Sequence, residues 1–463
     1  MTSQKDEFVL DGLPTLRGVL ADLANNFMDN AYRPHRISAY LSALVFGSVI
    51  CSRNYCFEGS YANTYNVIFG SSGSGKADLE KILNRWSYDV YCPDIIMSGS
   101  SFTSDSGVHS ALAAQPQSLI CIDEFGLILG NMSNDVIGKT ALVTLTKAYT
   151  LNGQYMRPKK YSKKVTNKKG PEEEVDDREK VINRPALVLV GFGTPEQMNL
   201  ILAEENFESG EMSRYMFWYI PDEIVHYSLS DTHLPDRAVS RILDVFQIGG
   251  NIINEMDGMQ NVNISAYNDP LPIPVPCILE DGEYDLKQLD VLQQKKVIEC
   301  KDVVEKTLAT RMLDKGKRIA ITLALLNQPY KSMQSKIDII KNGVSVTQKA
   351  FTDGIEIAGK SNKVMKKYEK ERKIYPARIV KACTRIDELI HMCGKGWTTR
   401  EEIALNNIKM SPNDWKLVEE YLEDIGIGWH ESVLPGQRGR SVKIYGTETP
   451  NHMEAVKYDL DES

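Results

Sequence analysis

The sequence lacks the features of a secreted, membrane-spanning or zinc-binding protein. None of its eight cysteines forms a CxxC pair, and neither Cys51 nor Cys56 has a histidine at zinc-ligand spacing. No run reaches the ~18 apolar residues that a membrane span requires, and the N-terminal MTSQKDEFVLDGL has no apolar secretory core. Because unpaired cysteines are typical of a reducing compartment, we expect a cytoplasmic protein that does not bind a membrane.

A net positive charge is also missing. The 463 residues carry a formal net charge of -8, which argues against a uniformly basic nucleic-acid coat protein but leaves room for a local basic groove. Charged residues make up 25% and hydrophobic residues 42% of the chain, which is an ordinary globular balance. The length suits roughly two to four domains.

The most informative stretch that is present is NVIFGSSGSGKADLEKIL, Asn66–Leu83. It has the GxxxxGK form, whose glycines let backbone N–H groups converge on a phosphate. An apolar strand leads into the loop and an amphipathic helix follows it, as the mechanism requires. The three fixed positions alone arise by chance in about one chain in eight of this length, so the context carries the prediction. The expected nucleotide-binding residues are Gly70, Ser71, Ser72, Gly73, Ser74, Gly75, Lys76 and Ala77.

The loop departs from the usual pattern at Ala77. A serine or threonine normally stands there, and its hydroxyl holds Mg²⁺. Water can replace that ligand, because Mg²⁺ usually keeps several waters. Asp78 is also near, but a carboxylate beside phosphates repels them. We therefore expect ATP binding with Mg²⁺ to survive and hydrolysis to be slowed rather than lost.

Polar residues end the next two predicted strands. LICIDE closes with Asp123, a candidate Mg²⁺ ligand, and with Glu124, a candidate general base for the attacking water. The alternative is that both are surface acids that cap the next helix. The apolar run PALVLVGFG ends at Thr194, which either hydrogen-bonds the γ-phosphate or the water, or is a plain helix cap.

Two further features have open interpretations. Arg214 precedes the apolar strand of EMSRYMFW and is either a structural ion-pair residue or an arginine finger that reaches a neighbour's nucleotide. Residues 157–184 have a basic half before Gly170-Pro171 and an acidic half after it. They are either a disordered, solvated insertion or a hairpin or loop presented for a purpose.

The rest of the chain divides into helical and extended regions. Residues 12–57 and 300–372 have helical periodicity, and the Pro-rich NDPLPIPVPC predicts an extended connector. At the C-terminus we expect helices in PARIVKACTRIDELIHMC, in TTREEIALNNI with Thr398 or Thr399 as cap, and in SPNDWKLVEEYLEDIGI. The hairpin GWHESV/SVKIYG follows, and three helices with such a wing indicate a winged helix.

In their order, the loop with Lys76, the IDE strand, the GFGTPE strand and SGEMSRYMFW resemble the primase/helicase-type AAA+ ATPases of phages, plasmids and other mobile elements. The likeness covers about residues 15–370 and extends more distantly to minichromosome-maintenance helicases. It implies an α/β fold: a P-loop AAA+ core with a parallel sheet, a helical lid and a C-terminal winged-helix domain. The expected divisions are 1–60 for N-terminal helices, 61–225 for the core, 226–372 for connector and lid, and 373–463 for the winged helix.

The resemblance also implies partners and residue roles. It implies a homo-oligomeric ring, expected to be a hexamer, with ATP at the subunit interfaces, Lys76 and Thr194 acting in cis, and Arg214 acting in trans. A second-sensor arginine is expected, with Arg311 and Arg318 as candidates. The insertion becomes a pore hairpin that contacts DNA phosphates, through Lys159, Lys160, Lys163, Lys164, Lys168 and Lys169.

Two functional hypotheses follow. The first is an ATP-driven DNA translocase, a replicative helicase of a phage or mobile element, acting in the host cytoplasm on single-stranded or forked DNA with other replication proteins. The wing residues Arg438 and Arg440 are further DNA contacts, although the acidic third helix leaves protein binding as the alternative for this domain. The second hypothesis, favoured by Ala77 and the negative charge, is an ATP-gated replication initiator or helicase loader with little hydrolysis.

Overall fold

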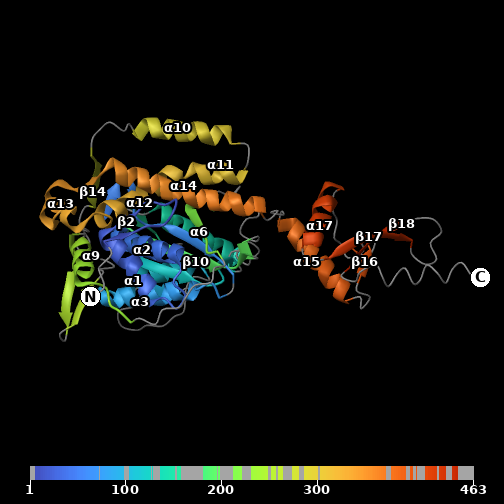
Figure 1. Cartoon of the computed structure of the whole chain (residues 1–463), viewed down its shortest axis with the longest axis horizontal. Coiled ribbons are helices and arrows are strands. Elements are labelled where there is room, and N and C mark those ends of the chain that lie inside the picture. The colour runs from blue at the N-terminus through green and yellow to red at the C-terminus, as the bar shows by residue number, and fades with distance from the viewer. Residues whose placement is uncertain are drawn as a thin grey trace, which may run out of the picture. The chain divides into compact units, whose positions relative to one another are not determined.

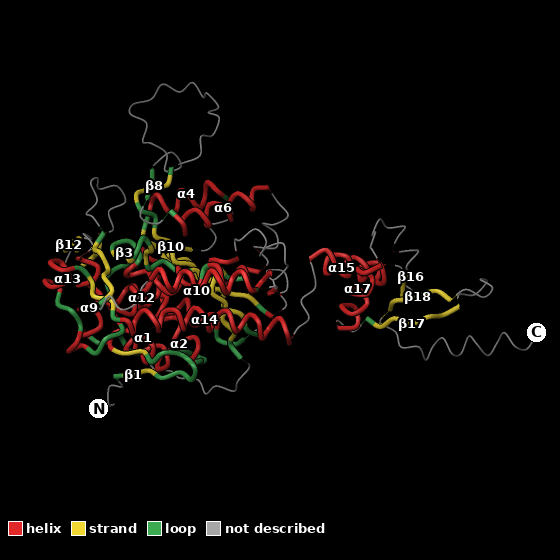
Figure 2. Tube along the Cα trace, turned by 90° about the horizontal axis from the view of Figure 1, so that it is seen from above, coloured by secondary structure: helices red, strands yellow, loops and turns green. Residues whose placement is uncertain are grey.

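The computed structural model describes residues 6–71, 73–98, 104–126, 128, 136–151, 154–157, 181–195, 197–198, 212–221, 231–248, 252–256, 259–263, 274–280, 286–300, 303–371, 377–392, 397–399, 403, 412–424, 427–433 and 441–446. The chain forms two compact units that divide between Arg372 and Lys373 (Figures 1 and 2). None of the described helices has the length and apolar character needed to cross a membrane. The predicted site residues outside the described parts are Ser72, Lys159, Lys160, Lys163, Lys164, Lys168, Lys169, Arg438 and Arg440.

A five-stranded parallel sheet forms the centre of the larger unit. Its strands, in chain order, are β5 (Tyr65–Phe69), β6 (Ile96–Ser98), β7 (Gln117–Ile122), β10 (Ala186–Gly193) and β11 (Tyr215–Tyr219). They lie side by side in the order β11-β5-β10-β7-β6. Every residue of β5, β7 and β10 is buried, as expected for continuous apolar strands that are covered on both faces. The predicted α/β class with a parallel sheet is confirmed.

The strand register gives this sheet two distinct ends. Tyr65 is level with Leu189 and Tyr215, whereas Phe69 is level with Gly193 and Tyr219. Because all five strands run in one direction, the segments that follow them gather at the carboxyl end of the sheet. The segments that precede them gather at the amino end.

Helices cover both faces of the sheet. These helices are α2 (Arg36–Cys51), α3 (Lys76–Asp89), α4 (Asp105–Ala114) and α6 (Val136–Thr150). Ile68 of β5 belongs to the same apolar core as α2 and α3, while the Tyr65 hydroxyl donates to the Leu145 carbonyl of α6 at 2.7 Å. Residues three apart in a strand point to opposite faces, so α2 and α6 lie on different sides. The amphipathic helix predicted after the loop is confirmed in α3, where Leu79, Ile82, Leu83 and Trp86 are all buried.

The helices that come first and last in the sequence of the larger unit pack together. Figure 1 shows α1 (Gly18–Asn30) and α2 near α12 (Met312–Leu326) and α14 (Gln348–Glu371). Helix α12 contacts both α2 and α14, and α14 contacts β11. Segments that are some 280 residues apart in the sequence therefore share one core.

Glycines let α12 and α14 approach closely. A Cβ on Gly354 would lie 2.5 Å from the Gly316 carbonyl oxygen and 3.1 Å from the Ala320 nitrogen. Both obstacles are backbone atoms, so they cannot rotate away. We expect Gly354→Ala to lower the free energy of unfolding by about 2 kcal/mol, the usual size of an overpacking penalty, measured by chemical denaturation.

Gly359 provides the matched control on the same helix. A Cβ there meets only the Met312 sulfur, at 3.7 Å. Gly359→Ala is therefore expected to be neutral or to stabilise by up to about 1 kcal/mol through helix propensity. Equal stabilities for the two variants would contradict the role assigned to Gly354.

A second sheet corrects the predicted connector. It comprises β3 (Tyr55–Phe57), β4 (Ser60–Tyr61), β14 (Val275–Leu279) and β15 (Val344–Val346), in the order β15-β14-β3-β4. The Pro-rich stretch thus ends in a strand, paired with β3 on one side and β15 on the other. Partners this distant in the sequence decide strand formation, and local composition does not reveal them.

Short elements complete the larger unit. They are β1 (Glu7–Phe8), β2 (Leu16–Arg17), η1 (Pro93–Ile95), β8 (Tyr155–Met156), β9 (Ile182–Asn183), η4 (Met212–Arg214), α9 (Asp236–Ile248), β12 (Ile252–Met256), β13 (Met259–Asn263), α10 (Leu286–Glu299), α11 (Val303–Thr310), η5 (Tyr330–Ser332) and α13 (Lys336–Asn342). Strands β12 and β13 pair as an antiparallel hairpin. The Asp257-Gly258 dipeptide between them is a hairpin signal that our sequence interpretation overlooked.

The ends of the predicted insertion are paired. Tyr155 and Met156 of β8 face Asn183 and Ile182 of β9 in an antiparallel ladder. The ladder directly precedes β10, so the insertion leaves the fold at the amino end of the sheet. Such pairing at its base is what a hairpin requires; residues 158–180 lie outside the described chain.

The smaller unit contains α15 (Ala377–Met392), β16 (Trp397–Thr399), α17 (Pro412–Asp424), β17 (Gly428–Val433) and β18 (Ser441–Gly446). The two long helices and the β17–β18 hairpin appear as predicted. Thr398 and Thr399, the two candidate helix caps, lie in β16 and pair with Tyr445 and Ile444 of β18. The result is a three-stranded sheet in the order β16-β18-β17. Because an N-cap residue itself has extended backbone, the capping role stays a prediction.

Candidate functional site

The glycine-rich loop connects β5 directly to α3. It begins where the Gly70 amide donates to the Gly193 carbonyl at 3.3 Å, and α3 begins at Lys76. Gly73 and Gly75 have φ angles of 83° and 81°, in the left-handed region that glycine adopts without steric penalty. The strand–loop–helix context that the motif needs is therefore present.

Lys76 holds the loop to a neighbouring strand. Its ammonium donates to the Gly70 carbonyl at 2.7 Å and to the Gly193 carbonyl at 2.8 Å. Gly193 is the last residue of β10. The ammonium thus lies between the carboxyl ends of two adjacent strands, at the mouth of the loop.

An arginine outside the motif contacts the loop, and sequence reasoning missed it. Arg33 lies in the short connection between α1 and α2. Its backbone N–H donates to the Asp78 carboxylate at 2.9 Å, and its guanidinium donates to the Gly73 carbonyl. No local signal marks this residue, because it is 40 positions from its partner. The contact also engages one oxygen of Asp78, the carboxylate expected to disfavour phosphate.

The acidic pair after β7 forms an exposed turn at the same end of the sheet. Asp123 and Glu124 are both exposed, and the Glu124 amide donates to Asp123 Oδ1 at 2.9 Å. The Phe125 ring, which follows the turn, packs directly against Gly191 of β10, where an added Cβ would lie 2.5 Å from the ring. Because Ile122 is level with Gly191 of β10, the turn that carries the two carboxylates lies beside the end of β10, the strand that Lys76 contacts.

Glu80 brings another carboxylate to this place. It lies one helical turn beyond the exposed Ala77 on α3. Partial burial raises the pKa of Glu80, and the nearby charge of Asp123 raises it further. Glu80 was not among the predicted residues; its helical spacing from Ala77 was the available signal.

The donor set fits Mg²⁺ held largely by a nucleotide. Among the described residues, no group of three or more His, Cys, Asp or Glu side chains comes together to hold a metal. Mg²⁺ commonly uses one or two carboxylates together with substrate phosphates. Asp123 and Glu80 supply such carboxylate oxygens, and the hydroxyl ligand is absent at Ala77.

Thr194 follows β10 and makes the contacts of a helix cap. Its hydroxyl accepts from the Gln197 amide at 3.4 Å, and its own amide donates to Gln197 Oε1 at 3.3 Å. These are the contacts of the capping alternative. The residue also directly follows Gly193, whose carbonyl binds Lys76, so a contact with a nucleotide or water stays a prediction.

Arg214 lies at the opposite end of the sheet. It directly precedes Tyr215, which is level with Tyr65 at the start of β5. The five residues of β5 separate it from the loop by roughly 16 Å, at about 3.3 Å per residue. An arginine side chain cannot bridge that length, so the structure does not bring Arg214 together with its own Lys76. Partial burial lowers the pKa of Arg214, and the charge of Arg311 lowers it further.

The two second-sensor candidates also lie toward the amino end. Arg318 is buried, donates to Asp314 Oδ2 at 3.0 Å and the Asn63 carbonyl at 3.2 Å, and stacks 3.9 Å from the Tyr149 ring centre. Its guanidinium is a structural element of the core. Arg311 lies one turn before Lys315, whose ammonium donates to the Tyr215 carbonyl at 2.6 Å.

Comparison with known proteins gives no family for this chain. No protein-family model matches it, and no curated protein matches it either.

Proposed function

We propose that this chain is a P-loop ATPase of the AAA+ class that works on DNA as a ring oligomer. The observation that carries the proposal is the contact of Lys76 with the ends of β5 and β10, beside the carboxylates that end β7. In open parallel α/β sheets, ligands bind outside the carboxyl ends of the strands. A cationic loop and adjacent acids at that end are the parts that binding a Mg²⁺-nucleotide requires.

The strand order places the candidate residues at neighbouring positions of the sheet. Numbered along the chain, the five strands lie in the order 5-1-4-3-2. The loop strand is thereby central, with the Thr194 strand beside it and the Asp123 strand next. The smaller unit, with its helices and three-stranded sheet, is compatible with the proposed winged helix.

The residues then have distinct roles in hydrolysis. Loop amides and the Lys76 ammonium bind the phosphates. Asp123 and Glu80 would hold Mg²⁺, which would supply positive charge to offset the charge of the phosphates. Glu124 accepts a proton from the attacking water as general base. Thr194 orients that water or the γ-phosphate.

The positions of Arg214 and of the Lys-rich insertion, both at the amino end of the sheet, favour a ring oligomer that acts on DNA. Arg214 is too far from its own loop to act in cis, so a role in hydrolysis requires a second subunit. The base of the Lys-rich insertion is at that same amino end. We propose that the insertion lysines contact DNA phosphates, with Arg438 and Arg440 as further contacts, in a translocase or replicative helicase of a phage or mobile element.

Ala77 favours a second candidate function, an ATP-gated initiator or helicase loader. The position is exposed at the start of α3, and alanine offers no metal ligand there. Slow turnover with nucleotide-dependent assembly would suit a protein that loads or marks DNA. The translocase should hydrolyse ATP faster when DNA is present, whereas the initiator or loader should hydrolyse it slowly.

Steady-state ATP hydrolysis with and without single-stranded DNA tests the proposal. We expect DNA-stimulated turnover in the native chain and faster turnover in Ala77→Ser, because the added hydroxyl supplies a direct Mg²⁺ ligand. Glu124→Gln serves as the blank, with turnover lowered by about a hundredfold or more through loss of the general base.

The outcomes separate the two functions. Turnover in the native chain that rises with DNA supports the translocase. Turnover only in Ala77→Ser supports the initiator or loader. A native chain that binds no ATP, with or without Mg²⁺, would refute both.

A further inference from the structure

The side chain of Arg33 runs alongside the phosphate loop. A Cβ on Gly75 would lie 3.0 Å from both Cβ and the carbonyl oxygen of Arg33, and one on Gly73 would lie 2.9 Å from Arg33 Nη1. The backbone of Arg33 is therefore packed against Gly75, while its guanidinium reaches Gly73. The approach of the Arg33 backbone leaves little room for a side chain at Gly75, and the positive φ angles favour glycine at both loop positions.

The guanidinium contact fixes the direction of a loop peptide. Arg33 donates to the Gly73 carbonyl, and in a planar trans peptide the next N–H points the opposite way. That N–H belongs to Ser74, and it donates across the loop to the Ser71 carbonyl at 3.2 Å. With the carbonyl held outward by Arg33, the Ser74 amide faces the loop interior, where a phosphate oxygen can replace the Ser71 carbonyl as acceptor.

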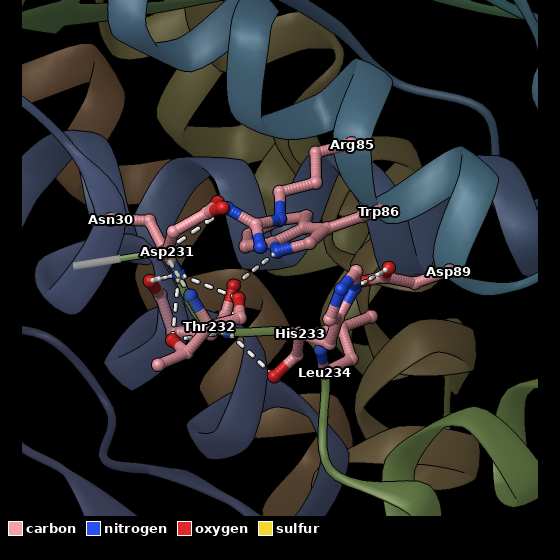
Figure 3. A network of polar contacts seen from close by, with 9 residues as sticks. Asn30, Arg85, Trp86, Asp89, Asp231, Thr232, His233 and Leu234 are labelled. Atoms are coloured by element: carbon pink, nitrogen blue, oxygen red, sulfur yellow. Dashed lines mark hydrogen bonds and ion pairs between the residues drawn. The ribbon is translucent and has the colours of Figure 1, made fainter.

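Helix α1, which precedes Arg33, and α3, which follows the loop, are held together at a second place. Figure 3 shows the segment before α9 lying between α1 and α3. The Asn30 side-chain oxygen accepts from the Thr232 amide at 2.8 Å and from Arg85 at 3.2 Å. Farther along α3, Asp89 accepts from the Leu234 amide at 3.0 Å. Helix α3 is thus fixed to α1 near its end as well as at its start.

We propose that Arg33 is a positioning residue of the nucleotide site, which holds the Gly73–Ser74 peptide so that its N–H points at the phosphates. This inference depends on the proposed nucleotide binding. It makes the N-terminal helical pair part of the site, although the pair precedes the loop strand in the sequence. A charge-assisted bond to a backbone carbonyl is about twice as strong as a neutral one, which suits this task.

The test compares nucleotide affinity across three variants of the full chain, by titration with ATP and with ADP. Arg33→Ala is expected to weaken both affinities by about tenfold, the effect of losing one hydrogen bond to a charged group. Arg33→Lys should recover most of that loss, because an ammonium still donates to the Gly73 carbonyl. Thermal unfolding without nucleotide should differ little among them, since Arg33 is exposed.

Arg36 is the matched control. It is an exposed arginine three residues away that donates to the Val9 carbonyl and lies 4.7 Å from the Phe8 ring centre, in another part of the surface. Arg36→Ala should bind nucleotide as the native chain does. Native affinity in Arg33→Ala, or no recovery in Arg33→Lys, overturns this inference alone. A native chain that binds neither nucleotide overturns the proposed function and this inference with it.

Discussion

Replacing Arg214 with alanine is expected to lower ATP hydrolysis by about a thousandfold or more, the usual effect of losing an arginine finger. Nucleotide affinity should stay unchanged, because Arg214 and the loop lie at opposite ends of β5. The measurement is ATP turnover beside equilibrium ATP binding. Thermal unfolding accompanies both, since Arg214 is half-buried among aromatic rings.

Mixing two inactive variants provides the sharper test of action in trans. Lys76→Ala removes phosphate binding and keeps Arg214, while Arg214→Ala does the reverse. In a mixed ring, some interfaces join an intact Lys76 from one subunit to an intact Arg214 from the next. Hydrolysis should therefore reappear on mixing, and each variant alone sets the baseline.

The structural alternative for Arg214 makes the opposite prediction. If Arg214 only stabilises the amino end of the sheet, Arg214→Ala lowers the melting temperature and mixing restores nothing. Activity lost together with ATP binding would also contradict a role in trans. Either outcome would remove the main support for the proposed ring, which is the action of Arg214 in trans.

Lys315→Met is expected to flatten the dependence of stability on pH in the alkaline range. Lys315 is fully buried, and burial lowers the pKa of its ammonium from 10.5 to about 7. Between those values the unfolded chain binds a proton that the folded chain has released. The free energy of unfolding of the native chain therefore rises with pH through this window.

The magnitude follows from the size of the pKa shift. Each pKa unit corresponds to about 1.4 kcal/mol. Between pH 7 and 10.5 the free energy of unfolding should therefore rise by several kcal/mol more in the native chain than in the variant. Below about pH 7 both states are protonated and the difference stays constant. Chemical denaturation at a series of pH values measures it.

Lys331 supplies the control for this titration. It is exposed, on η5, so Lys331→Met should keep the native slope. Parallel slopes for the native chain and Lys315→Met would contradict the lowered pKa, because they would mean that the Lys315 ammonium keeps its proton in the folded chain throughout this pH range. The loss of the bond to the Tyr215 carbonyl shifts the variant's whole curve without changing its slope.

The candidate residues at the carboxyl end of the sheet could be predicted from the sequence, because they come after apolar strands. A continuous apolar run identifies a buried parallel strand, and the residue after it must emerge at one end of the sheet. This reasoning found Lys76, Asp123 and Thr194 without any knowledge of strand order. Arg33 and Glu80 were missed because they approach through tertiary packing, and neither stands at the end of a strand.

Strand pairing and burial between distant parts of the chain were harder to predict from the sequence, because they also depend on tertiary packing. Strand β14 depends on β3, over 200 residues earlier, and β16 depends on β18 across α17. Arg318 was one of the two candidates for the second-sensor arginine. Its burial against Tyr149 and Asn63 emerges only when helices from distant parts of the chain meet.

Glu124 has a backbone that glycine would adopt with less strain. Its φ angle is 51°, a conformation that is uncommon for a residue with a side chain. Folding alone would thus be better served by a smaller residue at this turn. The protein keeps a carboxylate at this strained position, so the candidate general base costs the fold some stability.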